Sequence, residues 1–273
     1  MIYVCLPSRD EASTLGLVLW KIRRVFEAID REYQVLVADD GSTDDTAQVL
    51  ERYGEVLPMI VIRHREPKGY AATVEALLRR ALELTDRPKR DCAIVMHADY
   101  VHRPEHLADA VRAIDGGADI VIGESPSAPG LSGSHRLVRR FGARWLRSAV
   151  QVPGVRDPIS GFVGFRLATL RHMLEHPEGR LTCEGWASNA ELLALAGAQA
   201  RRVDTFPMTE RHDQRERPSR VAPWSVARAL VGSRRRVATA RARATAWAAE
   251  RPASRPEPRE GRPSRRRGRR GRP

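Results

Sequence analysis

The sequence predicts an α/β domain over residues 1–212, built on a Rossmann-like, mostly parallel sheet with helices on both faces. Short runs rich in Val and Ile alternate with longer segments in which apolar residues recur at helical spacing. The runs are apolar throughout, as strands buried on both faces of a parallel sheet are. Their strict alternation with helices favours parallel strands joined by helical crossovers.

The first half of the chain supplies the expected sheet. Each predicted strand is short and apolar and is followed by polar or turn-forming residues, which is typical of a buried strand. The expected strands are Ile2–Leu6, Val35–Ala38, Met59–Ile62, Ala93–Met96 and Ile120–Ile122.

Four helices are expected between these strands. Ser13 is the predicted N-cap of the first, whose apolar residues from Leu15 to Ile29 fall on one face. Pro104 occupies a favoured first helical position of the fourth, which Gly116 and Gly117 end. The expected helical ranges are about 13–29, 43–53, 70–84 and 104–116.

The second half of the chain is less regular. A loop rich in Pro, Ser and Gly is expected over 125–133, and a turn-rich crossing over 153–161. Helices are expected over 134–150 and 184–197. Residues 213–250 form a basic segment that is helical from Trp224 to about Ala249. Residues 251–273 are rich in Arg, Pro and Gly and are predicted to be a disordered tail, because they cannot bury enough apolar surface to fold.

Charge is distributed unevenly along the chain. The sequence carries a formal net charge of +13, to which residues 211–250 contribute +7 and residues 251–273 contribute +8. Residues 1–210 therefore carry −2, so the expected fold is close to neutral. The basicity belongs to an appendage, which argues against a nucleic-acid-binding fold.

The sequence also limits the compartment and the class of enzyme. Cys5, Cys92 and Cys183 are widely spaced and odd in number, so we expect reduced core residues of a cytoplasmic protein. No signal sequence is expected, because Arg9 closely follows the short apolar start, and no run of about 18 apolar residues predicts a membrane span. A Gly-rich dinucleotide loop and a Gly-Lys-Ser/Thr loop are both absent, which argues against NAD enzymes and P-loop NTPases.

Polar loops follow three of the expected strands, at the edge where α/β sheets bind ligands. The second strand ends in Asp39 and Asp40, and carboxylates there suit a base imide or a ribose hydroxyl. The following Gly-Ser-Thr-Asp is also ordinary turn chemistry. The loops concerned are 7–11, 39–45 and 97–102.

Further motifs accompany these loops in a fixed order. A Lys-Gly turn precedes the third helix, an Asp-x-x-Ser-Gly-Phe segment lies in the crossing, and single Glu, Pro and Arg residues follow. The motifs are Pro7-x-x-Asp10-Glu11, Asp39-Asp40-Gly41-Ser42-x-Asp44, Lys68-Gly69, His97-Ala98-Asp99 with His102 and Pro104-Glu105, Asp157-Pro158-x-Ser160-Gly161-Phe162, then Glu191, Pro207, Arg211 and Ser219-Arg220.

This series resembles glycosyltransferase family 2, and within it the polyprenyl-phosphate sugar transferases such as dolichol-phosphate mannosyltransferase. The resemblance covers about residues 1–220. It implies a single GT-A type domain that transfers a sugar from a UDP- or GDP-linked donor with the help of a divalent cation. The residues it implies for binding nucleotide or substrate are Pro7, Ser8, Arg9, Glu11, Asp39, Asp40, Lys68, Gly69, Ala98, Arg136 and Ser160.

The cation, Mn²⁺ or Mg²⁺, is expected near the end of the fourth strand, where it would neutralise the departing nucleoside diphosphate. Asp99 is the expected oxygen ligand. His97 stands where the family has its first Asp. As a ligand it favours Mn²⁺, which tolerates one nitrogen ligand better than Mg²⁺; otherwise it is a hydrogen-bonding loop residue beside a weakened site.

On the acceptor side, Asp157 and Arg211 are the predicted catalytic residues. Asp157 would deprotonate a neutral acceptor hydroxyl or position an acceptor that is already anionic. Arg211 resembles the family's phosphate-binding arginine. Arg136, Arg139 and Arg140 lie where lipid-using relatives hold acceptor-phosphate arginines, although three arginines on one helix are also common on a surface. Residues 123–125 read Gly-Glu-Ser where those relatives have Gly-Ser-Arg, so one arginine is missing.

The basic segment has two interpretations. Trp224, Ala227, Leu230 and Val231 are spaced for one helix face among arginines, which fits an interfacial helix on anionic lipid over 224–249. This predicts a peripheral protein at the inner face of the plasma membrane. The Arg-rich tail alternatively predicts nucleic-acid binding through the tail alone. A nucleotide-binding, catalytically degenerate transferase is the third hypothesis, motivated by His97.

Overall fold

A computed structural model describes residues 1–125, 129–214 and 223–250 of the chain. The predicted disordered tail, the Ser219-Arg220 motif and residues 126–128 of the predicted loop lie outside these described residues. Of the segment predicted over 213–250, residues 213–214 and 223–250 are described.

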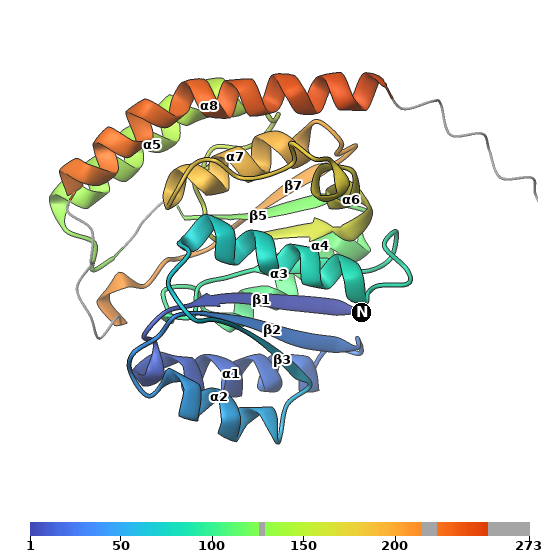
Figure 1. Ribbon diagram of the computed structural model, residues 1–273, viewed down its shortest axis with the longest axis vertical. Helices are drawn as coiled ribbons and strands as arrows, with labels where there is room; N and C mark the ends of the chain where they lie inside the picture. Colours follow the sequence, from blue (N-terminus) through green and yellow to red (C-terminus); the bar gives the residue numbers. More distant parts are fainter. Residues whose placement is uncertain (126–128, 215–222, 251–273) are drawn as a thin grey trace, which may run out of the picture.

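A mixed sheet forms the centre of the molecule (Figure 1). Within the described residues it has seven strands in the order β3-β2-β1-β4-β6-β5-β7. All neighbours pair in parallel except β6, which is antiparallel to both β4 and β5. The strands are β1 Ile2–Ser8, β2 Tyr33–Asp40, β3 Met59–His64, β4 Cys92–Val95, β5 Ile120–Glu124, β6 Val163–Arg166 and β7 Val203–Pro207.

Helices cover both faces of the sheet. Helices α1, α2 and α4 pack on one face, and α3, α5, α6 and α7 on the other, with α8 outermost along α5 and α7 (Figure 1). The helices are α1 Ala12–Glu27, α2 Thr46–Gly54, α3 Tyr70–Leu84, α4 Leu107–Asp115, α5 Gly133–Val150, α6 Leu167–Glu175, α7 Trp186–Gly197 and α8 Pro223–Ala249, with short 3₁₀ helices at Pro104–His106 and His212–Gln214.

The predicted mostly parallel α/β fold is confirmed, with local corrections. Ser13 does not cap α1, which begins at Ala12. The Glu11 N–H group instead donates to Thr46, the first residue of α2, and the Ala12 N–H group donates to Asp44 in the loop before it. Helix α1 therefore needs no cap from its own side chains. β6, α6 and β7 were not predicted.

The apolar face of helix α8 is buried inside the molecule. Leu230, Val237, Ala240, Ala244 and Trp247 are buried against α5 and α7. The four residues expected on one membrane-facing stripe are therefore divided, because Leu230 is 3% exposed whereas Trp224 is 80% and Val231 63% exposed. Within the described residues, no helix has both the length and the apolar character needed to cross a bilayer.

Candidate functional site

Three polar loops meet at one edge of the sheet. β1 lies between β2 and β4, so the loops that follow these strands are neighbours. Ser8 at the end of β1 is in register with Asp39 on β2, and Asp99 follows β4. Since adjacent strands lie about 5 Å apart, β2 and β4 are about 10 Å apart across β1. The predicted meeting of the Asp39 and Asp99 loops is therefore present.

The first two loops are held together by hydrogen bonds. The Asp10 N–H donates to Ser42 Oγ at 2.8 Å, and the Thr43 N–H donates to Asp10 Oδ1 at 2.6 Å. Asp10 has a positive φ of 50°, which is unusual for a residue with a side chain. Aspartate tolerates this left-handed conformation better than most residues, and the two hydrogen bonds fix the loop in it.

The first and third loops are joined through Thr14 at the start of α1. Its hydroxyl is 3.0 Å from the Ala98 carbonyl oxygen and 3.2 Å from Glu11 Oε2. Ala98 itself is 2% exposed. The Ala98 carbonyl thus contributes to the connection between the first and third loops.

The predicted nucleotide-binding residues line the junction of β1 and β2. Asp39 is 6% exposed, and its Oδ1 accepts a hydrogen bond from the Ser42 N–H. Ser8 is buried, and its hydroxyl has no hydrogen-bond partner among the described residues. A buried polar atom without a partner is costly, so a ligand group that binds Ser8 would be favoured. Pro7 is half-buried and Arg9 is exposed beside them.

Asp40 serves a different purpose from Asp39. Its two oxygens accept hydrogen bonds from the Lys68 and Gly69 N–H groups, at 2.8 and 2.9 Å, and Oδ1 lies 2.8 Å from His64 Nδ1. Burial acts to raise the pKa of Asp40, but these hydrogen bonds outweigh it and the pKa is lowered. Asp40 therefore positions the Lys68–Gly69 turn, where Gly69 has a φ of 96°.

The third loop carries the candidate cation ligands. Asp99 is 4% exposed, and its Oδ1 lies 4.0 Å from His97 Nδ1. Tyr100, the next residue, has a positive φ of 62°, a strained position. The His97 ring fits against Gly161, where a Cβ would come within 2.2 Å of Nε2. The described residues contain no cluster of three or more candidate metal ligands.

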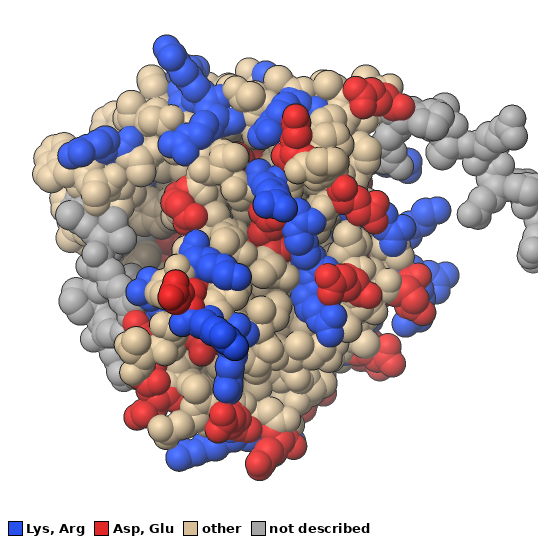
Figure 2. Space-filling model, in the orientation of Figure 1, with Lys and Arg blue, Asp and Glu red and all other residues tan. Residues whose placement is uncertain are grey.

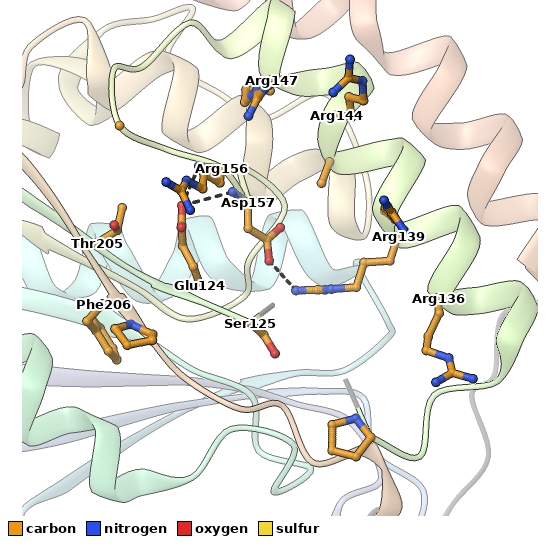
Figure 3. A pocket seen from close by; sticks show the side chains of 15 residues that line it. Glu124, Ser125, Arg136, Arg139, Arg144, Arg147, Arg156, Asp157, Thr205 and Phe206 are labelled. Atoms are coloured by element: carbon orange, nitrogen blue, oxygen red, sulfur yellow. Dashed lines mark hydrogen bonds and ion pairs between the residues drawn. The ribbon is translucent and has the colours of Figure 1, made fainter. Parts of the chain in front are cut away.

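A cavity of about 1090 Å³ lies between α5, the 153–161 crossing and the ends of β5 and β7 (Figure 3). Asp157 and Glu124 are its carboxylates. Its other charged residues are all arginines, namely Arg136, Arg139, Arg140, Arg144, Arg147 and Arg156. The lining therefore carries an excess of positive charge and suits an anionic ligand.

A buried ion network joins this cavity to the third loop. The Arg139 guanidinium lies 2.6 Å from Asp157 Oδ2 and 2.7 Å from Glu210 Oε1. Glu210 Oε1 is also 3.6 Å from His102 Nε2, and His102 Nδ1 accepts a hydrogen bond from the His97 N–H. The network thus extends from the candidate base to the candidate cation loop.

The network affects its two carboxylates in opposite ways. Burial raises the pKa of Asp157 to about 6. Arg139 acts to lower this pKa, and the neighbouring Glu210 and Glu124 carboxylates offset part of that lowering. Burial would also raise the pKa of Glu210, but Arg139, His102 and His212 hold it well below its usual value. Glu210 is therefore the fixed anion, and Asp157 is the group that can change protonation near neutral pH.

The structure shows the contacts of the predicted residues Arg211, Ser160 and Arg136. Arg211 pairs with Asp213 at 2.7 Å, and Arg139 is the residue beside Asp157. The Arg211 N–H does donate to the Val101 carbonyl, which places it next to the third loop. Ser160 is buried, and its hydroxyl donates to the Gly123 carbonyl at 2.6 Å, so it shapes the crossing. Arg136 lines the cavity as predicted.

Sequence reasoning missed three carboxylates at the site. Glu210 follows β7, a strand that was not predicted. Glu184 precedes α7 in the chain, but its carboxylate lies next to the first residues of α3. Its Oε2 accepts a hydrogen bond from the Ala71 N–H at 3.3 Å and lies close to Gly69. Glu124 accepts hydrogen bonds from the Arg156 and Asp157 N–H groups. This residue stands in the Gly-Glu-Ser sequence that departs from the Gly-Ser-Arg of the lipid-using relatives, and it holds the 153–161 crossing in place. An acidic residue directly after a strand was the signal available for Glu124.

The fold is that of GT-A type glycosyltransferases. The chain belongs to glycosyl transferase family 2, whose sequence profile matches residues 3–174.

Curated relatives agree with this family. Dolichol-phosphate mannosyltransferase of Pyrococcus furiosus is 26% identical over 183 residues, which cover 65% of this chain and 49% of that protein. Polyprenol monophosphomannose synthase of Mycolicibacterium smegmatis is 27% identical over 177 residues, which cover 61% of this chain and 62% of that protein. The chain thus spans about half to three-fifths of the length of these relatives.

Solved structures share the fold. Glucosyl-3-phosphoglycerate synthase from Mycobacterium tuberculosis, in complex with Mn²⁺, UDP-glucose and glycerol 3-phosphate, superposes with a TM-score of 0.62. The sequence identity is 18%, and the match covers 88% of this chain and 80% of that one.

Proposed function

We propose that this protein transfers a sugar from a nucleoside diphosphate sugar to an acceptor that carries a phosphate group. One observation carries the proposal: a buried ion network through His102, Glu210 and Arg139 joins the loop that contains Asp99 to an arginine-lined cavity that contains Asp157. This connection supports a donor site at the loop edge and an anion site in the cavity next to it. The relatives named for mannose transfer to dolichol phosphate and polyprenol phosphate support this combination.

The donor is expected over the first two loops. The Ser8 hydroxyl and the Asp39 carboxylate are polar groups that can hydrogen-bond a base or a ribose. Asp40 holds the Lys68–Gly69 turn in place through the two backbone N–H groups, and the exposed Lys68 ammonium of that turn suits a diphosphate. UDP and GDP remain equal candidates for the nucleotide.

Asp99 and His97 would hold a divalent cation. One carboxylate and one imidazole suit Mn²⁺, and two protein ligands are sufficient when phosphate oxygens and water complete the shell. When bound, such a cation supplies Lewis-acid neutralisation of the departing nucleoside diphosphate. The complex of the solved relative with Mn²⁺ and UDP-glucose supports this assignment.

Asp157 has two possible functions that depend on the nucleophile. With a neutral acceptor hydroxyl, ionised Asp157 accepts the proton, for which a pKa of about 6 is well matched to neutral pH. With a phosphate oxygen as nucleophile no base is needed, and Asp157 positions the acceptor together with Arg139. In both cases the cavity arginines bind the acceptor's phosphate.

The test is a transfer assay with purified protein, Mn²⁺ and a panel of UDP- and GDP-sugars, offered polyprenyl phosphate or a water-soluble phosphate monoester. We expect one donor to raise the melting temperature and to release nucleoside diphosphate in the presence of an acceptor. If no donor binds, and Asp99→Ala behaves like the parent throughout, the proposal is wrong. If a donor binds without transfer, the degenerate-transferase hypothesis holds instead.

His97→Asp separates a competent site from a weakened one. If His97 is a working ligand, the substitution will not raise metal-dependent turnover but will shift the preference from Mn²⁺ toward Mg²⁺, which prefers oxygen ligands. A large gain in turnover with both metals would mean that His97 weakens the site.

A further inference from the structure

Helix α5 carries an unusual stripe of exposed apolar side chains. Leu137, Phe141 and Trp145 are 59%, 64% and 46% exposed. They lie four residues apart, so they follow one another along a single side of the helix. We call these three residues the α5 ridge.

Arginines flank the ridge on the side of the cavity. Arg136, Arg140, Arg144 and Arg147 are exposed and line the cavity, where Figure 3 labels Arg136, Arg144 and Arg147. From the helical spacing, they lie about a quarter-turn around the helix from the ridge. Arg234 of α8 lies on the other side, with its guanidinium 5.0 Å from the centre of the Trp145 ring. The ridge is therefore an apolar strip with a row of arginines on one side and Arg234 on the other.

Acidic side chains are absent from both helices that form this surface. The described α5 and α8 contain eleven arginines and no Asp or Glu. In Figure 2, the upper left of the molecule, over α5 and α8, shows basic and uncharged side chains, whereas the lower edge, over α1 and α2, shows acidic and basic side chains together. The surface has one sign of charge.

We propose that the α5 ridge docks the protein on an anionic lipid bilayer, with Leu137, Phe141 and Trp145 in the interfacial layer and the flanking arginines on lipid phosphates. Apolar and aromatic side chains beside arginines are the composition of an interfacial helix. Trp145 suits the interface because its ring is amphipathic.

Other occupants fit the ridge less well. A second copy packed ridge to ridge would bring the same arginines face to face without any carboxylate between them. A nucleic acid would pair with the arginines but would gain little from Leu137 and Phe141. Helix α8 cannot offer a comparable stripe, because its Leu230 is buried against Gly142 of α5.

Docking through α5 would bring the cavity to the membrane. The arginines of α5 that would contact lipid phosphates also line the cavity that contains Asp157. If the proposed function holds, a lipid-linked acceptor could place its phosphate in the cavity while its chain stays in the bilayer. The docking itself does not depend on that function.

The experiment measures co-sedimentation of the full chain with vesicles of phosphatidylcholine, with and without phosphatidylglycerol. We expect binding to require the anionic lipid. The triple variant Leu137→Ser, Phe141→Ser, Trp145→Ser should bind at least about tenfold more weakly, because it loses apolar burial at three sites. The control Leu17→Ser, Trp20→Ser removes exposed apolar residues from α1 and should bind like the parent.

Brominated lipids identify the helix that enters the interface. Bromine should quench the tryptophan fluorescence of the parent, and Trp145→Phe should remove most of this quenching while Trp224→Phe leaves it unchanged. Loss of quenching in Trp224→Phe instead would assign the contact to α8 and overturn the proposal. Equal vesicle binding by the triple variant and the parent would overturn it as well, as would a dimer in solution that the triple variant abolishes.

Discussion

The donor edge and the acceptor cavity are built by different interactions. At the donor edge, short loops after neighbouring strands bind each other through hydrogen bonds of backbone N–H groups to side-chain oxygens, such as Asp10 to Ser42 and Thr43 to Asp10. In the cavity, a buried ion network joins residues far apart in the sequence, with Arg139 between Asp157 and Glu210. The first region provides directional groups, and the second provides charge.

Because of this difference, the donor edge and the acceptor cavity should respond differently to salt, to pH and to mutation. Hydrogen bonds between neighbouring loops are short-range and depend little on salt. The arginine-lined cavity has an excess of positive charge, so its affinity for anions should fall with ionic strength. The binding of donor and of acceptor should therefore be separable by mutation, by salt and by pH.

Arg139→Met should have the largest effect and should test whether the network is structural. It leaves the Asp157 and Glu210 carboxylates buried without their shared cation, which should lower the free energy of unfolding by about 3–5 kcal/mol. Urea denaturation measures this. Arg202→Met breaks an exposed pair with Asp204 and should change stability little. Equal midpoints for the two variants would refute a structural role for the network.

Asp99→Asn should affect transfer without affecting the fold. Loss of the only carboxylate ligand proposed for the cation should lower kcat at least about a hundredfold. Steady-state kinetics over a Mn²⁺ titration measures this. Asp109→Asn, an exposed residue paired with Arg112, is the control. Activity within a few-fold of the parent at every Mn²⁺ concentration would exclude Asp99 as a ligand.

Arg144→Gln combined with Arg147→Gln should act on the acceptor alone. We expect the KM for a phosphate-bearing acceptor to rise about tenfold at low salt, with less difference at high salt, and the KM for the donor to stay unchanged. Kinetics at two ionic strengths checks this. A matched change in both KM values would show that the two halves are not separate.

Glu124→Gln should have the smallest effect, a shift in pH dependence. If Asp157 acts as a base, activity falls as the pH drops through about 6, because protonation removes the base. The Glu124 charge contributes to the raised pKa of Asp157. Removing that charge should therefore lower the pH at which activity falls to half by less than about one unit. The glutamine can still accept the Asp157 N–H bond. A half-activity pH that is higher in the variant than in the parent would contradict this reasoning.

The sequence predicted those parts of the site in which the functional residues directly follow a strand along the chain. Five strands and the three loops after β1, β2 and β4 were predicted because each motif directly follows its own strand. The partners of Asp40 could not be predicted, since no sequence pattern reveals that its oxygens accept hydrogen bonds from the Lys68 and Gly69 N–H groups. A pair of adjacent carboxylates looks the same whether one or both face a ligand.

The cavity could not be predicted because its partners are distant in sequence. Arg139 meets Glu210 across 71 positions, and Glu210 follows β7, which has little apolar content to mark it as a strand. The apolar residues of α8 resembled a membrane-facing stripe because periodicity shows a face but not what covers it. In the structure, α5 and α7 cover most of that face.

Gly161 has a consequence for how the third loop can evolve. A methyl group at position 161 would overlap the His97 imidazole, so the histidine can adopt this place only while residue 161 stays a glycine. The same Cβ would also come within 3.1 Å of His102 Cε1, so a larger residue at position 161 would press on both histidine rings of the loop at once. The glycine therefore constrains the second ring as well, whatever residue stands at position 97.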